Sequence, residues 1–396
     1  MPRNAKKIMS QAVSLIFISL AAAIFSTVFL LSLNYFFRLF TENLWLVFIL
    51  PILGVLTLWA FHKLTLRCST SHLHFEGITD YQAKTAENLG LGSALLVLIS
   101  ASLSQLFGAS TGREGAAIQY GASLGNFTSQ LQFKIFQLKD QDLIVRAGMV
   151  AGFSSLFGTP LAALVFLGER FGFKQATADS LKWAAVAYLS FYFAESFKAP
   201  HTQYPNWPDL SWNLGLVFSL LILFLLIFFA AVLYKKTMGL FFHIGFKYFR
   251  QDYLRIFIAG MMIAALTWTL GSAKYNGLGV SLTQQSFVTV CPWYDSILKS
   301  LFTLISVTSG FKGGEVTPLM AIGAALGSSL SAGLHLPLIV ASAMGCIFFF
   351  VQVLEIPLTG AFLMMELFGA SAAPIAFFCG IILWGFQKSN YHRWTL

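Results

Sequence analysis

The chain has 396 residues, of which 57% are hydrophobic and only 10% are charged, and its net charge is +9 at neutral pH. Soluble domains carry about a quarter charged residues, and apolar stretches recur here from end to end, so a soluble protein and a large soluble domain are both excluded. These stretches are too long and too uniformly apolar for barrel strands, which alternate. We therefore predict an all-α polytopic membrane protein.

Apolar segments follow one another along the whole chain. We expect helices at roughly 11–33, 44–61, 91–108, 145–169, 183–197, 213–234, 255–271, 297–308, 335–354 and 373–386. Several are shorter than the ~20 residues that a simple span needs, and glycine-rich pieces lie between them at 108–125 and 309–327. Short, glycine-interrupted segments in matching places of two halves are typical of transporter binding sites.

The basic residues mainly predict topology. One group lies before the first segment, and a second lies near the middle of the chain, at Lys235, Lys236, Lys247, Arg250 and Arg255. The positive-inside rule places both groups in the cytoplasm. The first segment is too long for a signal-peptide core, so we expect it to be retained. Because no aromatic-basic surface motif accompanies the charge, we expect no nucleic-acid partner.

The cysteines indicate no metal site. They lie at Cys68, Cys291, Cys346 and Cys379. This spacing contains no CxxC pair or other metal-ligand pattern, so we expect most of them to pack in apolar surroundings.

Two stretches of the chain resemble two later ones. Residues 115–125 read GAAIQYGASLG and residues 317–327 read TPLMAIGAALG, and both end in the same register. Downstream, PLAALVFLGE at 160–169 matches PLTGAFLMME at 357–366, at nearly the same offset. We therefore predict two homologous transmembrane halves, 1–205 and 206–396, joined by the loop HTQYPNWPDL. The repeat itself leaves open whether the halves are parallel or inverted.

Arg113 and Glu114 lie where a glycine-rich turn leads into a helix. A helix start carries unpaired N–H groups and the positive end of the helix dipole, which makes it an anion site. The Glu114 carboxylate could occupy that site and, once protonated, release it to an anion, coupling proton and anion movement. The alternative is an acid satisfied by the helix dipole or by Arg113. An ionisable residue at membrane depth is functional by default.

The second half repeats this arrangement with Gly313-Gly314-Glu315-Val316-Thr317-Pro318. A glycine turn again precedes a carboxylate and a helix start, with proline in the first helical turn. Thr317 offers a hydroxyl donor, and Glu315 with Glu114 could form a short proton relay. The alternative for Glu315 is a simple capping acid.

The motifs GREGA…GASLG, GTPLAALVFLGE and GGEVTPL…GAALG resemble the CLC family of anion channels and antiporters. GGEVTP, with Glu315 before Val316, resembles the fluoride-transporting branch, and Ala116 after GREG is consistent with that branch. The resemblance implies inverted-topology repeats with short and broken helices, a pore in each subunit, a homodimer in the lipid bilayer and no cofactor. It implies export of fluoride in exchange for protons, which suits a bacterial inner membrane.

The resemblance also implies roles for individual residues. Glu114 would be the gate and external proton carrier, and Glu315 a second proton or anion handler. The anion would be lined by Arg113, Gly115, Ala116, Val316, Thr317, Tyr391 and Phe75. Two departures from the family pattern stand out: Glu169-Arg170 replaces the usual Glu-Glu pair, and the first coordinating loop, at 68–80, matches no family version cleanly.

Other functions remain open on the sequence. A chloride/proton antiporter and a passive anion channel would use the same fold. A compact site of helix N–H groups and hydroxyls favours fluoride, because fluoride is small and strongly hydrated. A more distant alternative is a metal-dependent membrane hydrolase built on His72, His74 and Glu76. Neither an HExxH motif nor a nucleophile-base pair supports it.

Overall fold

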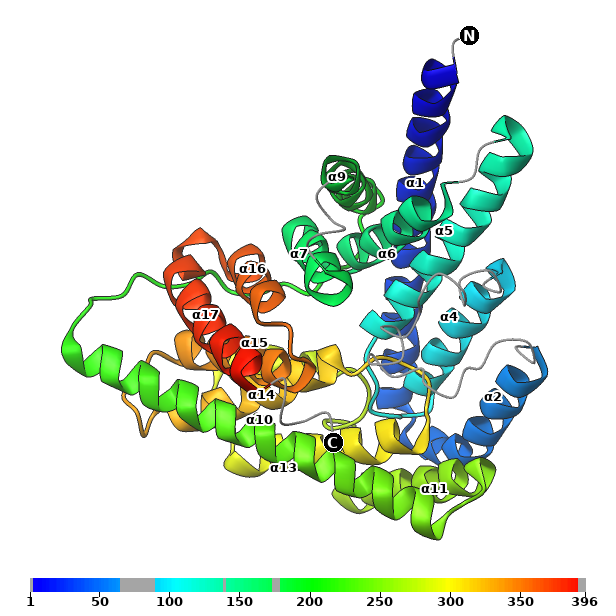
Figure 1. Cartoon of the computed structure of the whole chain (residues 1–396). Coiled ribbons are helices and arrows are strands. Elements are labelled where there is room, and N and C mark those ends of the chain that lie inside the picture. The colour runs from blue at the N-terminus through cyan, green and yellow to red at the C-terminus, as the bar shows by residue number, and fades with distance from the viewer. Residues whose placement is uncertain (1–2, 65–89, 138–139, 173–178, 391–396) are drawn as a thin grey trace.

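A computed structural model describes residues 3–64, 90–137, 140–172 and 179–390 (Figure 1). The first half contains α1 (Arg3–Glu42), η1 (Leu44–Ile49), α2 (Leu50–Leu64), α4 (Leu91–Leu106), α5 (Glu114–Phe136), α6 (Gln141–Phe157), α7 (Pro160–Phe171) and α9 (Ser180–Ser196). The second half contains α10 (Leu214–Tyr248), α11 (Asp252–Leu270), α12 (Val280–Val288), α13 (Trp293–Ser309), α14 (Val316–Ser331), α15 (Leu338–Leu354), α16 (Pro357–Phe368), η3 (Ala370–Ala372) and α17 (Ala373–Asn390). The prediction of an all-helical fold is confirmed.

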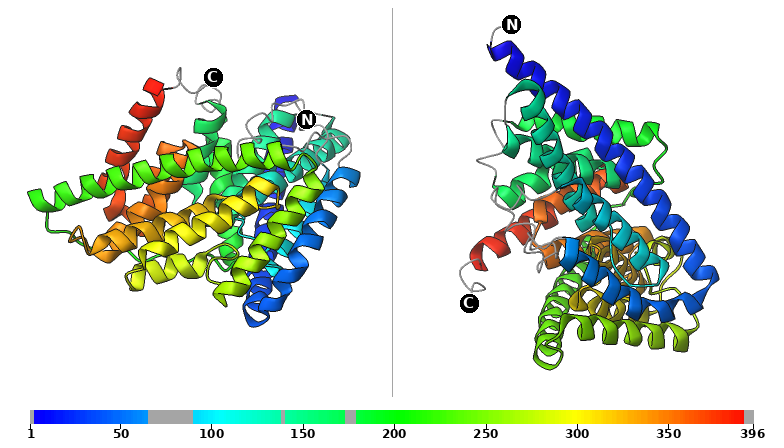
Figure 2. Two further views of the ribbon diagram at one scale, coloured as in Figure 1. Left: turned by 90° about the horizontal axis from the view of Figure 1, so that it is seen from below. Right: turned by 90° about the vertical axis from the view of Figure 1, so that its right-hand side faces the viewer.

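The helices differ greatly in length. Among the described residues, four spans are long and apolar enough to cross a membrane: Ala5–Glu42, Leu44–Lys63, Leu214–Tyr248 and Asp252–Leu270. Others, such as α14 and α16, are apolar but short. The long helix α1 contacts α4, α5, α6 and α9, and α10 crosses α13 and α15 (Figure 2). Helix α14 is buried along almost its whole length, whereas only 28% of the apolar window of α10 is buried.

Two of the expected segments are wrong in detail. The single segment expected at 145–169 is two helices, because Gly158 ends α6 with φ +73 and Pro160 begins α7. Glycine with positive φ ends helices and proline begins them. The glycine-rich piece 108–125 is mostly the helix α5. Its small residues lower the hydropathy of the segment without breaking the helix.

The repeated glycines lie at close helix crossings. A Cβ on Gly121 of α5 would be 2.2 Å from the carbonyl oxygen of Gly148 of α6, and a Cβ on Gly323 of α14 would be 2.0 Å from that of Gly345 of α15. Small residues let membrane helices approach this closely. The match between GASLG and GAALG therefore reflects two equivalent crossings, α5 with α6 and α14 with α15.

Helices α7 and α16 cap each other. The Glu169 carboxylate of α7 accepts hydrogen bonds from the Leu358 and Thr359 N–H groups, both at 2.7 Å. The Glu366 carboxylate of α16 accepts from the Leu161 N–H at 2.8 Å and the Ala162 N–H at 2.9 Å. Since each glutamate lies late in its own helix and meets the start of the other, the helices run antiparallel, as inverted repeats require. The division at 205/206 stays a prediction.

Removing either capping carboxylate is expected to destabilise the fold. Glu169→Ala and Glu366→Ala should each lower the free energy of unfolding by about 2 kcal/mol, because two buried N–H groups lose a charged acceptor. Thermal unfolding in detergent would measure the loss. Glu355→Ala is the control, since Glu355 is paired with Lys235 at the surface. Equal stability of all three variants would contradict the capping role.

The cysteines and the connecting loop were also predicted from the sequence. Cys291, Cys346 and Cys379 are buried, as predicted, and Cys68 lies outside the described residues. The loop HTQYPNWPDL is extended between α9 and α10. It is fastened to the second half where the Trp207 N–H donates to the Phe368 carbonyl at 2.7 Å.

Candidate functional site

Two glycine turns from the two halves meet at the centre of the site. Gly112 and Gly314 form an antiparallel bridge, in which the Gly314 N–H donates to the Gly112 carbonyl at 2.8 Å and the Gly112 N–H donates back. A Cβ on Gly112 would be 2.5 Å from Glu114 Oε2 and 3.0 Å from the Gly314 backbone. Glycine is therefore required here, and the starts of α5 and α14 are brought together.

The Glu114 side chain lies at the start of α14. Glu114 itself is the first residue of α5 and is fully buried. Its Oε2 accepts a hydrogen bond from the Thr317 N–H at 3.2 Å and from the Arg113 N–H at 3.0 Å, and its Oε1 accepts from the Thr317 hydroxyl. A carboxylate thus occupies an anion site made by a helix N-terminus and a hydroxyl.

Arg113 balances this buried charge and connects it to the loop between the halves. Its Nε lies 3.7 Å from Glu114 Oε1, and its Nη2 donates to Thr202 Oγ1 at 3.0 Å. The neighbouring His201 holds the loop, with Nδ1 2.9 Å from Glu195 Oε1 and Nε2 2.9 Å from the Ser155 carbonyl oxygen. The connecting loop therefore forms part of the surroundings of Glu114.

Glu315 lies beside the same helix start. It occupies the N-cap position of α14 and is 6% exposed. Its side chain makes no capping hydrogen bond to α14, so the interpretation as a simple capping acid is wrong. Glu315 is therefore a buried carboxyl group that does not cap its own helix.

The residues predicted for the site form two groups. Arg113, Glu114, Gly115 and Ala116 lie at the start of α5, and Glu315, Val316 and Thr317 lie at the start of α14. A Cβ on Gly115 would be 3.3 Å from the Gly314 Cα, and Ala116 and Val316 are buried. The sequence prediction thus placed residues that are about 200 positions apart in one site.

Several other predicted residues lie outside the part of the chain that the structure describes. They are Phe75, Tyr391, His72, His74 and Glu76. Anion coordination by the first two and metal binding by the other three stay predictions.

Two tyrosines near the site were missed. Tyr204, in the connecting loop, packs edge-on against Phe287 and Phe368, with ring centroids at 6.2 Å and 5.3 Å. Burial raises the pKa of Tyr204, on which the charges of Arg113 and Glu114 act in opposite directions. The phenol therefore stays protonated at neutral pH. The interpretation of this loop as a connector alone is incomplete, and its aromatic residues were the signal for a further role.

The second missed residue is Tyr234 of α10. It is 5% exposed and within electrostatic reach of Glu315. Its hydroxyl has no hydrogen-bond partner in the described ranges. Nothing in the apolar sequence around it indicated that this tyrosine would come within electrostatic reach of Glu315.

Glu169 of α7 is held at the start of another helix. Both of its carboxylate oxygens are bonded at the start of α16, where the Thr359 hydroxyl also donates at 2.5 Å. The Glu169 carboxylate therefore fastens the end of α7 to the start of α16.

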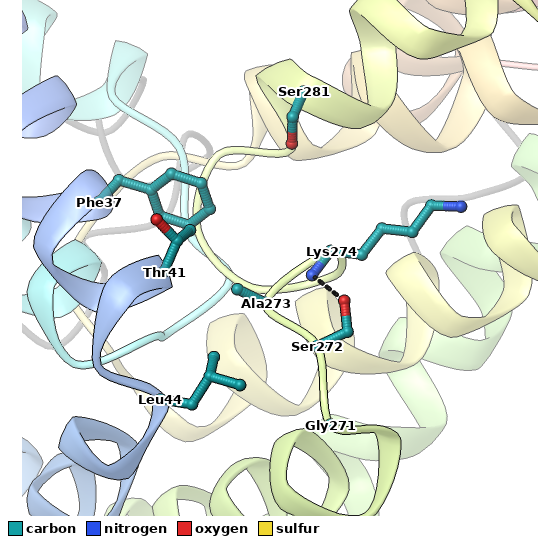
Figure 3. Close-up of a pocket in the computed structure, with 8 residues that line it drawn as sticks. All are labelled: Phe37, Thr41, Leu44, Gly271, Ser272, Ala273, Lys274 and Ser281. Atoms are coloured by element: carbon teal, nitrogen blue, oxygen red, sulfur yellow. Dashed lines mark hydrogen bonds between the residues drawn. The ribbon is translucent and has the colours of Figure 1, made fainter.

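A separate surface pocket lies between the end of α1 and the loop after α11 (Figure 3). It is lined by Phe37, Thr41, Leu44, Gly271, Ser272, Ala273, Lys274 and Ser281. The Lys274 N–H donates to Ser272 Oγ at 3.2 Å at its wall (Figure 3). The pocket does not include the starts of α5 and α14.

The Thr317 hydroxyl is expected to contribute strongly to anion binding. In a Glu114→Gln background, where no carboxylate competes, Thr317→Val should weaken fluoride binding about tenfold, because a hydrogen bond to a charged group is lost. Isothermal titration with fluoride would measure this. The control is Thr308→Val, whose hydroxyl bonds only the Leu304 carbonyl of its own helix. Equal affinities in both variants would exclude Thr317 from the site.

A buried carboxylate bonded at the start of a second helix, inside a bundle of membrane helices, is the arrangement expected of an anion-transport protein. A family model described as "Voltage gated chloride channel" matches residues 54–383. The chain belongs to this family of integral membrane proteins, the CLC family.

The names of individual relatives mention fluoride, chloride or both ions. A "Chloride/fluoride channel protein" of Pseudomonas syringae pv. tomato is 34% identical over 375 residues, covering 91% of this chain and 80% of the relative. An "H(+)/Cl(-) exchange transporter" of Vibrio cholerae is 27% identical and covers 65% of this chain and 58% of the relative.

The solved structures agree on the fold. The crystal structure of a CLC-type fluoride/proton antiporter has a TM-score of 0.83 at 24% identity and covers 96% of both chains. A slow cyanobacterial Cl-/H+ antiporter has a TM-score of 0.76 at 17% identity and covers 95% of this chain and 94% of that one.

Proposed function

We propose that this protein exports fluoride across the membrane in exchange for protons. The observation that carries the proposal is the Glu114 carboxylate bonded to the N–H and hydroxyl of Thr317. Protonation removes the negative charge from this carboxylate and frees the same donors for an anion. When the proton leaves, the carboxylate regains its charge and displaces the anion. One site thus binds the gate and the anion in turn, which couples the two ions.

The donors at the site favour fluoride over chloride. A small, strongly hydrated anion needs short contacts with strong donors, and a backbone N–H and a hydroxyl offer them. A protonated Glu315, at the same helix start, would add an O–H donor. The name of the Pseudomonas relative includes both fluoride and chloride, and the name of the Vibrio relative also keeps chloride as the second candidate.

The proposed roles follow the position of each residue. Glu114 is the gate and the external proton carrier, and Glu315 passes protons onward. Arg113, Gly115, Ala116 and Val316 line the anion position, with Phe75 and Tyr391 as further ligands. The bonds of Glu169 join α7 to α16, and we assign the onward transfer of protons to Glu315, which lies at the same helix start as Thr317.

We also propose a homodimer with a separate pore in each subunit, located in a bacterial inner membrane. Family membership supports both statements, and the exposed apolar residues of α17, such as Phe378 and Ile381, suit lipid or a second subunit. Light scattering on the detergent-solubilised protein would give its mass. A monomeric mass would contradict the dimer.

Ion efflux from reconstituted liposomes tests the function. Vesicles loaded with fluoride or chloride are diluted into ion-free buffer, and the released anion and the protons taken up are recorded together. We expect fluoride to leave faster than chloride and protons to enter with it. Equal chloride efflux would favour the chloride/proton antiporter, and fluoride efflux without proton uptake would favour a passive channel.

A further inference from the structure

Lys299, in the middle of α13, is fully buried, which lysine almost never is unless it is paired. Its Nζ donates to the Ser110 hydroxyl oxygen at 2.9 Å and to the carbonyl oxygens of Tyr275 at 3.0 Å and Gly277 at 2.7 Å. An ammonium has three N–H donors and no acceptor. The Asn276 carbonyl oxygen lies 3.4 Å away as well, and three carbonyl acceptors match the three N–H donors of an ammonium, whereas a neutral amine offers only two.

The oxygens that hold this charge are neutral. The carboxylate nearest along the same helix face is Asp295, one turn earlier on α13. It accepts hydrogen bonds from Lys274 Nζ at 2.7 Å and from the Tyr275 hydroxyl at 2.6 Å. Asp295 is therefore balanced by Lys274, and the positive charge of Lys299 is held by a hydroxyl and carbonyl dipoles.

The same face of α13 also holds the backbone that leads to Glu114. Thr303 Oγ1 lies 2.9 Å from Ser110 Oγ, and Ser306 Oγ accepts from the Ser110 N–H at 2.9 Å. Lys299, Thr303 and Ser306 share a helix face because they are spaced by four and three residues. Ser110 lies four residues before Glu114, so α13 holds the segment that ends in the gate.

The loop after α11 is fastened to that segment as well. The Gly277 N–H donates to the Ala109 carbonyl at 3.2 Å, and Asn276 Nδ2 donates to the Gly108 carbonyl at 2.7 Å. A Cβ on Gly279 would be 2.7 Å from Lys299 Cε, so the lysine stem is tightly enclosed. The ammonium thus lies at the junction of α13, this loop and the segment before α5.

We infer that Lys299 is a positioning residue for the gate. Its ammonium is a tethered internal cation that draws Ser110 and the 275–277 carbonyls together, and thereby sets where the Glu114 carboxylate meets Thr317. This inference rests on the proposed function, because it takes Glu114 as the gate. A looser segment would let the anion pass without the gate being protonated, so coupling would fail before transport does.

The test compares Lys299→Met, Ser110→Ala and the double variant in fluoride-loaded liposomes. The number of protons taken up per fluoride released does not depend on how much protein is folded, so a merely structural lysine would leave it unchanged. We expect Lys299→Met to lower this ratio about fivefold, as expected of mutations in a network that links two sites. Ser110→Ala should lower it in the same direction, and the double variant should be no worse than Lys299→Met.

Each outcome decides the inference. A wild-type ratio in Lys299→Met or in Ser110→Ala overturns it, and so do effects that multiply in the double variant. If Lys299→Met does not fold, Ser110→Ala alone gives the answer, since it keeps the ammonium and its carbonyl partners. The control is Lys236→Met, at an exposed position of α10. A wild-type protein that moves no fluoride would instead contradict the proposed function.

Discussion

Glu114→Gln is expected to abolish proton transport while fluoride still crosses the membrane. A glutamine cannot titrate, and its amide nitrogen would bring a donor to a place where Thr317 already presents two donors to the Glu114 carboxylate. Proton uptake driven by fluoride efflux should fall at least about a hundredfold, as when a general acid-base group is removed. A pH electrode and a fluoride electrode in one liposome suspension would record both ions.

Glu42→Gln is a matched control for this variant. Glu42 is a glutamate at the exposed end of α1, where it pairs with Arg38. Its replacement should leave both ion fluxes unchanged. Proton uptake at the wild-type rate in Glu114→Gln would remove Glu114 from the role of gate, even if fluoride transport remained.

Glu315→Gln should also stop proton transport, but for a different reason. Glu315 lies beside Thr317 at the start of α14, is buried, and makes no capping bond there. The Glu315→Gln variant keeps the donors that bond Glu114. Protons that reach Glu114 then have no second carboxyl group to receive them. We expect proton uptake to fall at least about a hundredfold, and fluoride binding to weaken because a protonated carboxyl donor is lost.

For Glu315→Gln, titration calorimetry would measure the fluoride affinity, and paired electrode recordings would measure the proton uptake. Glu366→Gln is a control in a membrane helix, since Glu366 bonds the start of α7. It should reduce stability and leave the ratio of protons to fluoride unchanged. Normal proton pumping by Glu315→Gln would exclude Glu315 from the relay, and the internal route would then have to be sought elsewhere.

Glu114 and Glu169 illustrate how the position of a glutamate decides what it does. Glu114 and Glu169 both belong to family motifs of the first half, and both accept backbone N–H groups of a second-half helix. Each also accepts from a threonine hydroxyl, but Glu114 in addition lies near the Arg113 guanidinium at a junction of two glycine turns. Glu169 meets only the first turn of α16, which joins the halves. We therefore expect the same interaction to serve as a gate at Glu114 and as a structural cap at Glu169.

The sequence by itself determined the membrane class, the repeat and the residues at both helix starts. These follow from local physics: long apolar runs need helices, glycine pairs permit tight turns, and a carboxylate after such a turn meets helix N–H groups. The same local reasoning merged α6 with α7, because it weighed apolarity more than Gly158 and Pro160.

Only the tertiary structure decided which groups those residues contact. The bond from Thr317 to Glu114, the reciprocal caps of Glu169 and Glu366 and the cage around Lys299 all join segments far apart in the chain. Lys299 lies in an apolar stretch, and its partners are mostly backbone carbonyls, which every residue carries. Side-chain identity therefore gave no sign of that cage, because it depends on how the loops fold back against α13.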